Sequence, residues 1–126
     1  MKVSVSVHPD TEYPTIAKVY AKLLQDWKTT TALPSVFGRD GMWEMNSRTR
    51  DSQIYKLHIR LSDEVPWKKH KPQIDRVSNN YLVYTQHWLD NERYQVISIM
   101  SPNAHELART SFLVELERRA EQFQNT

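Results

Sequence analysis

The sequence predicts a small α+β domain with the element order β-α-(loop)-β-β-β-α and an antiparallel sheet packed on helices. Short segments that alternate apolar and polar residues predict half-buried strands, and two segments with apolar residues every three or four positions predict helices. The length of 126 residues suits one core with two packed layers. We therefore expect residues 1–126 to form a single domain.

The first strand and helix are predicted from the amino-terminal quarter. Valines alternate with serines over residues 3–7, and a His-Pro pair follows. Asp10 or Thr11 is the expected N-cap of the helix. Its apolar residues recur at helical spacing: Ile16, Val19, Tyr20, Leu23, Leu24 and Trp27.

The middle of the chain is predicted as loop, strand and loop. Residues 33–41 contain a proline and both glycines of the chain, which favours a loop. Residues 54–61 alternate cleanly, with an apolar face and a basic face. Residues 62–80 are polar, with two prolines and several cations, and are predicted to form a long surface loop.

Two strands and a closing helical segment complete the prediction. Residues 81–88 and 94–100 favour β-structure and are separated by a polar stretch suited to a hairpin. Asn103 and Glu106 have the spacing of a capping box. Residues 109–111 interrupt the apolar stripe that follows, so the segment is either two short helices or one bent helix.

Composition excludes several classes of protein. The chain has 17 Lys+Arg and 15 Asp+Glu, a formal charge of +2, and no cysteine. It therefore has no disulfide framework, thiolate zinc site or cysteine nucleophile, and the charge balance disfavours a general nucleic-acid coat protein. Short apolar runs disfavour a membrane span. The first residues lack the apolar core of a secretory signal, so we expect a cytoplasmic protein.

Positive charge is concentrated locally. Residues 39–76 hold nine Lys or Arg against six Asp or Glu, together with Trp43 and Trp67. Cations interleaved with aromatic stacking surfaces suit single-stranded RNA.

The strongest candidate chemistry lies on the basic face of residues 54–61, where Lys56, His58 and Arg60 alternate. Cleavage of RNA by its own 2′-hydroxyl needs a base, a cation that stabilises the phosphorane and an acid for the leaving oxygen. His58 could move the proton, because its ordinary pKa is near neutrality, while the two cations stabilise charge. From spacing alone, an ordinary solvated strand face is the commoner explanation.

His105 is the second candidate, in the first turn of the closing segment with Arg109 one turn later. A capping or packing role is the commoner one for such a histidine. The five histidines show no metal-binding spacing, and the glycines are too few for a phosphate loop. No metal or small-molecule cofactor is therefore expected.

Four segments resemble the YafO family of type II toxins: Leu-Pro-Ser-Val-Phe-Gly-Arg-Asp (33–40), His-Ile-Arg-Leu (58–61), Leu-Val-Tyr (82–84) and His-Glu-Leu-Ala-Arg (105–109). The element order also resembles the wider RelE/ParE-like toxin fold. The resemblance implies a ribosome-dependent mRNA endonuclease that cuts translated messages, contacts the large ribosomal subunit and is inhibited by a cognate antitoxin.

The resemblance also implies roles for individual residues. Lys56 and His58 match the two basic strand positions of RelE-like sites, and Arg39, His105 and Arg109 match family motif positions. Tyr81 stands where RelE-like toxins often have an arginine, so Arg60 or Arg76 would have to supply that cation. The expected catalytic residues are Lys56, His58, Arg60 and His105. The expected contacts to RNA or the ribosome are Arg39, Lys68, Lys69, Lys71, Arg76 and Arg109.

Two other functions remain open from the sequence. A non-catalytic RNA- or ribosome-binding module would block translation by occupancy. A DNA-binding regulator ranks last, because no basic helix-turn-helix pattern is present. The antitoxin is expected to lie over the basic strand face or along the first helix.

Overall fold

The computed structural model describes residues 2–43, 47–108 and 111–126. Its strands form one sheet in the order β1-β5-β4-β3-β2. The strands are β1 (Ser4–Val7), β2 (Phe37–Met42), β3 (Ile54–Ile59), β4 (Tyr81–Gln86) and β5 (Arg93–Met100). The helices are α1 (Pro14–Thr30), α2 (Ser47–Asp51), α3 (Ala104–Leu107) and α4 (Phe112–Gln124), with a 3₁₀ turn η1 (Gln73–Asp75).

The α+β class is confirmed, but the sheet is mixed. Strand β1 runs parallel to β5, whereas β2, β3, β4 and β5 pair antiparallel in turn. Helix α1 carries the chain from β1 at one edge of the sheet to β2 at the opposite edge, and β1 gains its parallel neighbour only when β5, the last strand in the sequence, pairs with it. In the described part of the chain, no helix is long and apolar enough to cross a membrane.

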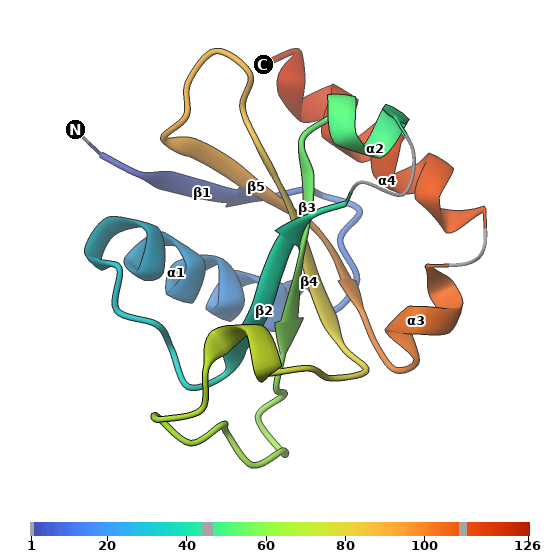
Figure 1. Ribbon diagram of the computed structural model, residues 1–126. Helices are drawn as coiled ribbons and strands as arrows, with labels where there is room; N and C mark the ends of the chain where they lie inside the picture. The colour runs from blue at the N-terminus through green and yellow to red at the C-terminus, as the bar shows by residue number, and fades with distance from the viewer. Residues whose placement is uncertain (1, 44–46, 109–110) are drawn as a thin grey trace.

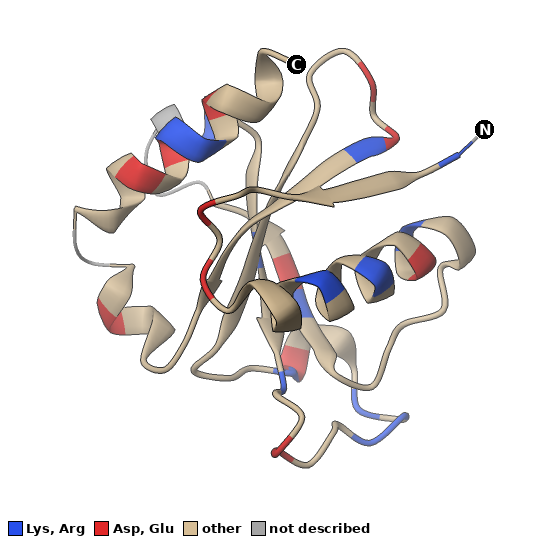
Figure 2. Cartoon of the chain, turned by 180° about the vertical axis from the view of Figure 1, so that it is seen from behind, with Lys and Arg blue, Asp and Glu red and all other residues tan. Residues whose placement is uncertain are grey.

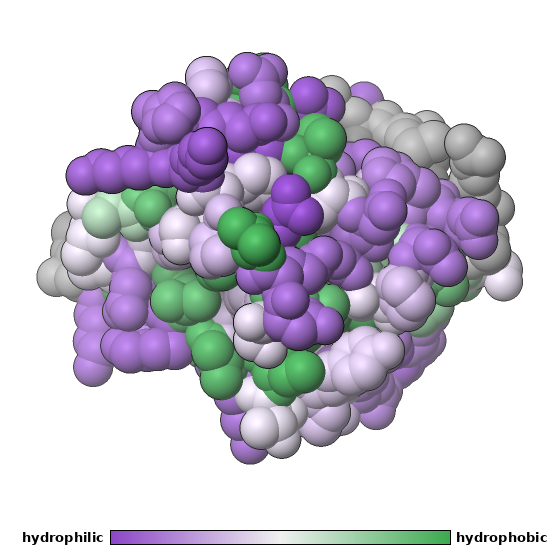
Figure 3. Space-filling model, turned by 90° about the horizontal axis from the view of Figure 1, so that it is seen from below, coloured by the Kyte–Doolittle hydropathy of each residue, from purple (hydrophilic) through white to green (hydrophobic). Residues whose placement is uncertain are grey.

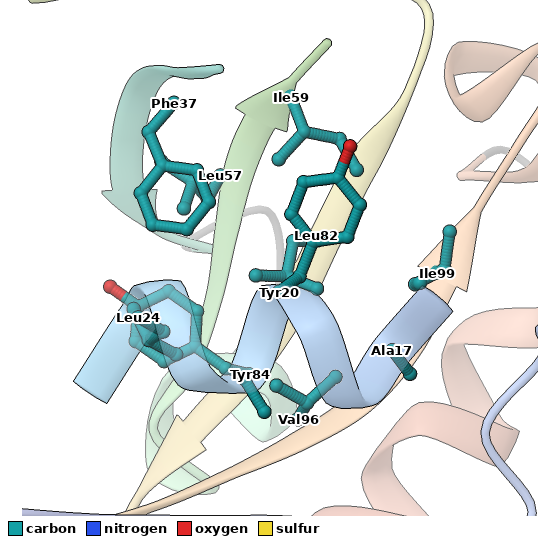
Figure 4. Packing of buried hydrophobic residues seen from close by; sticks show 11 residues of the cluster. Ala17, Tyr20, Leu24, Phe37, Leu57, Ile59, Leu82, Tyr84, Val96 and Ile99 are labelled. Atoms are coloured by element: carbon teal, nitrogen blue, oxygen red, sulfur yellow. The ribbon is translucent and has the colours of Figure 1, made fainter. Parts of the chain in front are cut away.

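Helices cover both faces of the sheet. Figure 1 shows α1 on one face, with α2, α3 and α4 on the other. The side chains under α1 form the first core, in which residues of the helix and of the strands face one another (Figure 4). Because alternate strand residues point to opposite faces, Leu57 and Ile59 of β3 enter this core, while Lys56 and His58 point to the other face.

Strand β2 lies where a loop was predicted, and that prediction is wrong. The pattern is hidden because β2 is an edge strand with a bulge between Phe37 and Asp40, which breaks the alternation of side chains. Neither glycine has a positive φ, so both continue the extended backbone. The strand ends beside β3, where the Trp43 N–H donates to the Ile54 carbonyl.

The helix boundaries differ from those predicted. Helix α1 begins at Pro14 rather than after Asp10 or Thr11, because proline is well suited to the first helical turn and Thr11 bonds instead to the Val96 carbonyl. The closing segment is two helices, which is one of the two predicted alternatives. The capping box is wrong, since the Asn103 side chain makes no cap hydrogen bond in its left-handed conformation, with φ 62°.

Helix α4 is fixed on the second face by a buried arginine. Arg119 is 5% exposed and pairs with Glu12 and Glu115. Its guanidinium also donates to the Ile97 carbonyl of β5. These bonds join α4 both to the sheet and to the segment before α1, so the face that carries Lys56 and His58 has a fixed border.

Candidate active site

Neighbouring strands bring the basic and aromatic side chains of the second face together. In the β3–β4 register His58 is opposite Tyr81, and Lys56 is opposite Val83. On the other side, Lys56 pairs with Gly41 of β2, and Arg39 lies in the bulge next to His58. Sequence reasoning singled out Arg39, Lys56 and His58 separately, and the sheet places them on one surface.

Tyr81 is the centre of this cluster. Its ring centroid is 4.8 Å from that of His58 and 5.3 Å from that of His105, which α3 contributes. The Tyr81 hydroxyl is 2.7 Å from Nδ1 of His105. The Nζ of Lys56 lies over the same ring, 5.5 Å from its centroid. We name Arg39, Lys56, His58, Tyr81 and His105 the sheet-face cluster.

His58 is held neutral. It is 5% exposed, and its Nδ1 lies 2.8 Å from the Ser78 nitrogen, whose N–H donates to the neutral ring, and 3.1 Å from the Ser78 carbonyl oxygen, to which a protonated ring could donate. Burial lowers the pKa of His58 to about 4; a backbone hydrogen bond with Ser78 opposes this, and the nearby His105 and Lys56 lower the pKa further. The expectation of a near-neutral pKa at His58 is therefore wrong.

Lys56 is a cation held between two aromatic rings. Its Nζ lies 5.3 Å from the Trp43 ring centroid and is half-buried. Burial, and then the charge of Arg39, lower the pKa of Lys56. The rings fix the direction of an ammonium that would otherwise sample many rotamers.

His105 is the exposed histidine of the cluster. It lies in α3, and its ring centroid is 6.1 Å from that of His58. Burial raises the pKa of its partner Tyr81, so Tyr81 stays a phenol at neutral pH. A solvent-facing imidazole next to a buried phenol can exchange protons with a substrate.

Arg60 does not join the other two basic residues of its strand. Its guanidinium lies 4.7 Å from the Trp67 ring centroid and 3.9 Å from the Glu64 carboxylate, within the following loop. The expected three-residue platform is therefore reduced to Lys56 and His58. Trp43 is fully buried and Trp67 is 7% exposed, so neither offers the stacking surface that the sequence suggested.

The long loop keeps its lysines exposed and its arginine buried. Arg76 is 3% exposed and donates to the carbonyls of Phe37, Lys68, Lys69 and Lys71. Its guanidinium thus organises the loop, whereas the three lysine side chains face solvent. Figure 3, seen from this side, shows hydrophobic patches between hydrophilic groups. Arg109 lies outside the described residues.

The central position of Tyr81 was missed by the sequence interpretation, which noted only that it replaces an arginine. Strand alternation places Tyr81 on one face, but its contact with His58 depends on the register across the 62–80 loop. Among the described residues, no three His, Cys, Asp or Glu side chains are grouped so that they could hold a metal ion.

Comparisons with known proteins identify the family. The family model for "Toxin YafO, type II toxin-antitoxin system" matches residues 25–125, which include the whole sheet-face cluster. The mRNA interferase toxin YafO of Escherichia coli (strain K12) is 32% identical over 92 residues, covering 66% of this chain and 65% of that relative. The match thus spans less than two thirds of that relative, and no solved structure matches. The chain belongs to the YafO toxin family of type II toxin–antitoxin systems.

Proposed function

We propose that this chain is an endoribonuclease toxin that inhibits translation by cutting mRNA on the ribosome. The observation that carries the proposal is the sheet-face cluster, in which two histidines contact one tyrosine beside two cations. The match to a relative named an mRNA interferase toxin supports RNA as the substrate.

The cluster supplies a base and two cations for cleavage by the RNA's own 2′-hydroxyl. His105 takes the 2′-hydroxyl proton on Nε2, with its Nδ1–H directed to the Tyr81 oxygen 2.7 Å away. Tyr81 is 1% exposed, so it positions the His105 ring and does not touch the substrate. The 2′-oxygen then bonds to phosphorus, the bond to the 5′-oxygen breaks, and a water molecule protonates the leaving oxygen. The hydroxide left by that water takes the Nε2 proton of His105, so all protons balance and His105 returns to its starting form.

The two cations of the cluster act on the phosphate. Lys56 and Arg39 stabilise the extra negative charge of the phosphorane. Unlike these two cations, neutral His58 is 5% exposed and packs against the Tyr81 ring, so it supports the tyrosine and does not contact the phosphate. This assignment moves the proton-transfer role from His58 to His105.

The partners follow from this function. The message would be held by the ribosome, with Lys68, Lys69 and Lys71 of the long loop as contacts to ribosomal RNA. A cognate antitoxin would inhibit the toxin, as the family description implies. Such a protein acts in the cytoplasm, where the ribosomes are.

Message ends mapped by primer extension test the proposal. After induction, with and without an inhibitor that clears ribosomes from messages, cuts are expected only on translated messages. The products should carry a 2′,3′-cyclic or 3′-phosphate and a 5′-hydroxyl, and chelation at constant ribosome integrity should not stop the reaction. Products with 5′-phosphates would contradict 2′-hydroxyl attack.

Single substitutions separate an enzyme from a module that acts by occupancy. A His105→Ala variant that still binds ribosomes but no longer cuts is expected of an enzyme. A chain whose inhibition of translation falls only in proportion to its affinity for ribosomes would be a binding module.

A further inference from the structure

Both glycines of the chain lie in strand β2, and they differ in their surroundings. A Cβ on Gly38 would clash with the Arg76 carbonyl and lie 2.9 Å from the Trp67 ring. Gly38 is therefore required for the packing of the long loop on β2.

No packing contact among the described residues requires glycine at position 41. A Cβ placed there meets no described heavy atom within 4 Å, and the residue does not have a positive φ. Glycine weakens a strand, because it loses more backbone entropy on folding and provides no side chain for packing. A glycine inside a strand often marks a place where a ligand approaches the backbone closely.

The space beside Gly41, which holds no atom of the described residues within 4 Å of a Cβ there, borders the sheet-face cluster. Gly41 is the registered partner of Lys56, so both residues are on the same face. Arg39 lies two residues away, and its Nε donates to the Ile74 carbonyl at 2.6 Å, which holds the guanidinium at the edge of the sheet. The charge of Arg39 acts on both Lys56 and His58.

The space beside Gly41 suits an anionic group on a polymer with a narrow backbone. Two cations flank a strand position without a side chain, so a phosphate could contact both of them there. The Gly41 N–H is bonded to the Asp40 carboxylate, which is directed to the Tyr84 hydroxyl, so the cations and not the backbone would hold the phosphate. Strand β2 is one of the two edge strands of the sheet, so no further strand blocks a linear polymer that passes across its outer side.

We propose that the edge of β2 at Gly41 is a phosphodiester subsite, where the RNA backbone crosses the sheet between Lys56 and Arg39. The subsite rests on the proposed nuclease function and would seat a phosphate next to the one that is cut. Gly41 is then a specificity residue: its missing side chain lets the backbone reach the cations.

The test is a set of variants that separates stability from activity. Gly41→Ala and Gly41→Thr should fold with a melting temperature equal to or above that of the wild type, since the backbone is extended and the space is open. Cleavage of message on programmed ribosomes should fall about 3-fold for Ala and at least 10-fold for Thr. Ser4→Thr is the control, because it adds a β-branched side chain at an exposed position of the opposite edge strand.

Binding provides a second readout that does not depend on cleavage. The probe is a 12-nucleotide single-stranded RNA with 2′-O-methyl groups, which cannot attack its own phosphates. Its dissociation constant should rise about 10-fold for Gly41→Thr and remain unchanged for Ser4→Thr.

The outcomes distinguish this inference from the proposed function. If the wild type cuts message and Gly41→Thr cuts equally fast, the subsite is wrong and the function stands. If the wild type does not cut, the function fails and binding decides: weaker binding by Gly41→Thr supports a phosphodiester subsite, whereas equal binding, or none by the wild type, overturns it.

Discussion

His58 shows how the fold changes the chemistry of a residue that the sequence places correctly. Alternation along β3 puts it on the face opposite the α1 core. Its pKa of about 4 comes from burial beneath neighbouring segments, including Ser78 of the loop. No pattern in a single sequence gives the depth of burial, so the protonation state of His58 could not be predicted.

The lowered pKa of His58 gives a pH dependence of stability. In the unfolded chain a histidine has a pKa near 6.5, so folding favours neutral His58. This contribution is complete above pH 6.5 and is lost as the pH falls toward 4, up to about 3 kcal/mol for a shift of this size. Urea unfolding of the wild type and His58→Asn at pH 7 and pH 4.5 measures it.

Between pH 7 and pH 4.5, the free energy of unfolding should fall less in His58→Asn than in the wild type. The exposed His70→Asn is the control and should behave like the wild type. Parallel pH profiles for the wild type and His58→Asn would show that His58 is not held neutral.

His105 and Tyr81 are predicted to matter most for the rate. His105→Ala should lower cleavage on ribosomes by roughly 10²- to 10⁴-fold, the usual effect of losing a general base. Tyr81→Phe removes the hydroxyl 2.7 Å from Nδ1 and should cost about 10- to 100-fold. Single-turnover cleavage with saturating ribosomes measures both effects.

His58→Gln serves as the comparison for these variants, because glutamine keeps a hydrogen-bond donor but cannot transfer a proton near neutrality. It should retain more activity than His105→Ala. The reverse order, with a folded His105→Ala at the wild-type rate, would return the proton-transfer role to His58.

At the scale of elements, the sequence predicted four of the strands, including the edge strand β1, but not the other edge strand, β2. Residues 54–61 alternate because β3 has a neighbour on each side and an apolar core on one face. Strand β2 has a bulge and two glycines, which resemble a loop in the sequence. The candidate site was predicted in part, since Lys56, His58 and His105 were identified but the β3–β4 register that adds Tyr81 was not.

The long loop depends on one arginine. Arg76 is buried and bonds to carbonyls at both ends of the 68–71 turn. Arg76→Ala should lower the free energy of unfolding by roughly 2 to 4 kcal/mol, because buried carbonyls lose charged donors. Chemical denaturation measures this loss, and Lys69→Ala, which removes an exposed side chain, should change stability by less than about 0.5 kcal/mol. Equal stabilities of the two variants would contradict the role of Arg76.

Helix α1 has an apolar groove beside its core face. Ile16, Val19 and Leu23 line it together with Val36 and Leu61, and its volume is about 500 Å³. Val19 is 60% exposed, which is unusual for a valine that follows a helical stripe. Because the family is one of toxin–antitoxin systems, we expect the antitoxin to bind in this groove through an amphipathic segment. A basic residue beside that segment could pair with Asp63, an exposed residue that lines the groove.

Val19→Glu should therefore weaken neutralisation without affecting the nuclease. The probe is the protein that abolishes growth arrest when co-expressed with the wild type. Cells with Val19→Glu should arrest with or without it, whereas Thr29→Glu, on the same helix outside the groove, should still be neutralised. Full neutralisation of Val19→Glu would exclude the α1 groove as the antitoxin site.

At the scale of the molecule, basic and acidic side chains share the same helices and do not form separate charged surfaces. Figure 2 shows both basic and acidic residues on α1 and on α4. Some surface cations are paired with an acidic neighbour, such as Lys22 with Asp26 at 3.0 Å and Arg118 with Glu115 at 2.6 Å. With a net charge of +2, the chain can neutralise few phosphates of a free RNA. The sheet-face cluster provides chemistry, while affinity for the message must come from elsewhere.

The low net charge of the chain predicts that the ribosome supplies most of the binding energy for the message. If the ribosome holds the message in the reactive orientation, the cleavage rate can rise by several powers of ten, because the entropy of orienting the phosphate has been lost before the toxin binds. The second-order rate constant on message in programmed ribosomes should exceed that on the same message free in solution by at least 10³-fold. Raising the salt from 50 to 200 mM, a range in which the ribosomes stay intact, should lower the rate on free message more steeply than the rate on message in programmed ribosomes. Only the cations of this chain hold the free message. Equal rate constants on the two substrates would mean that the cluster and the exposed lysines bind RNA unaided.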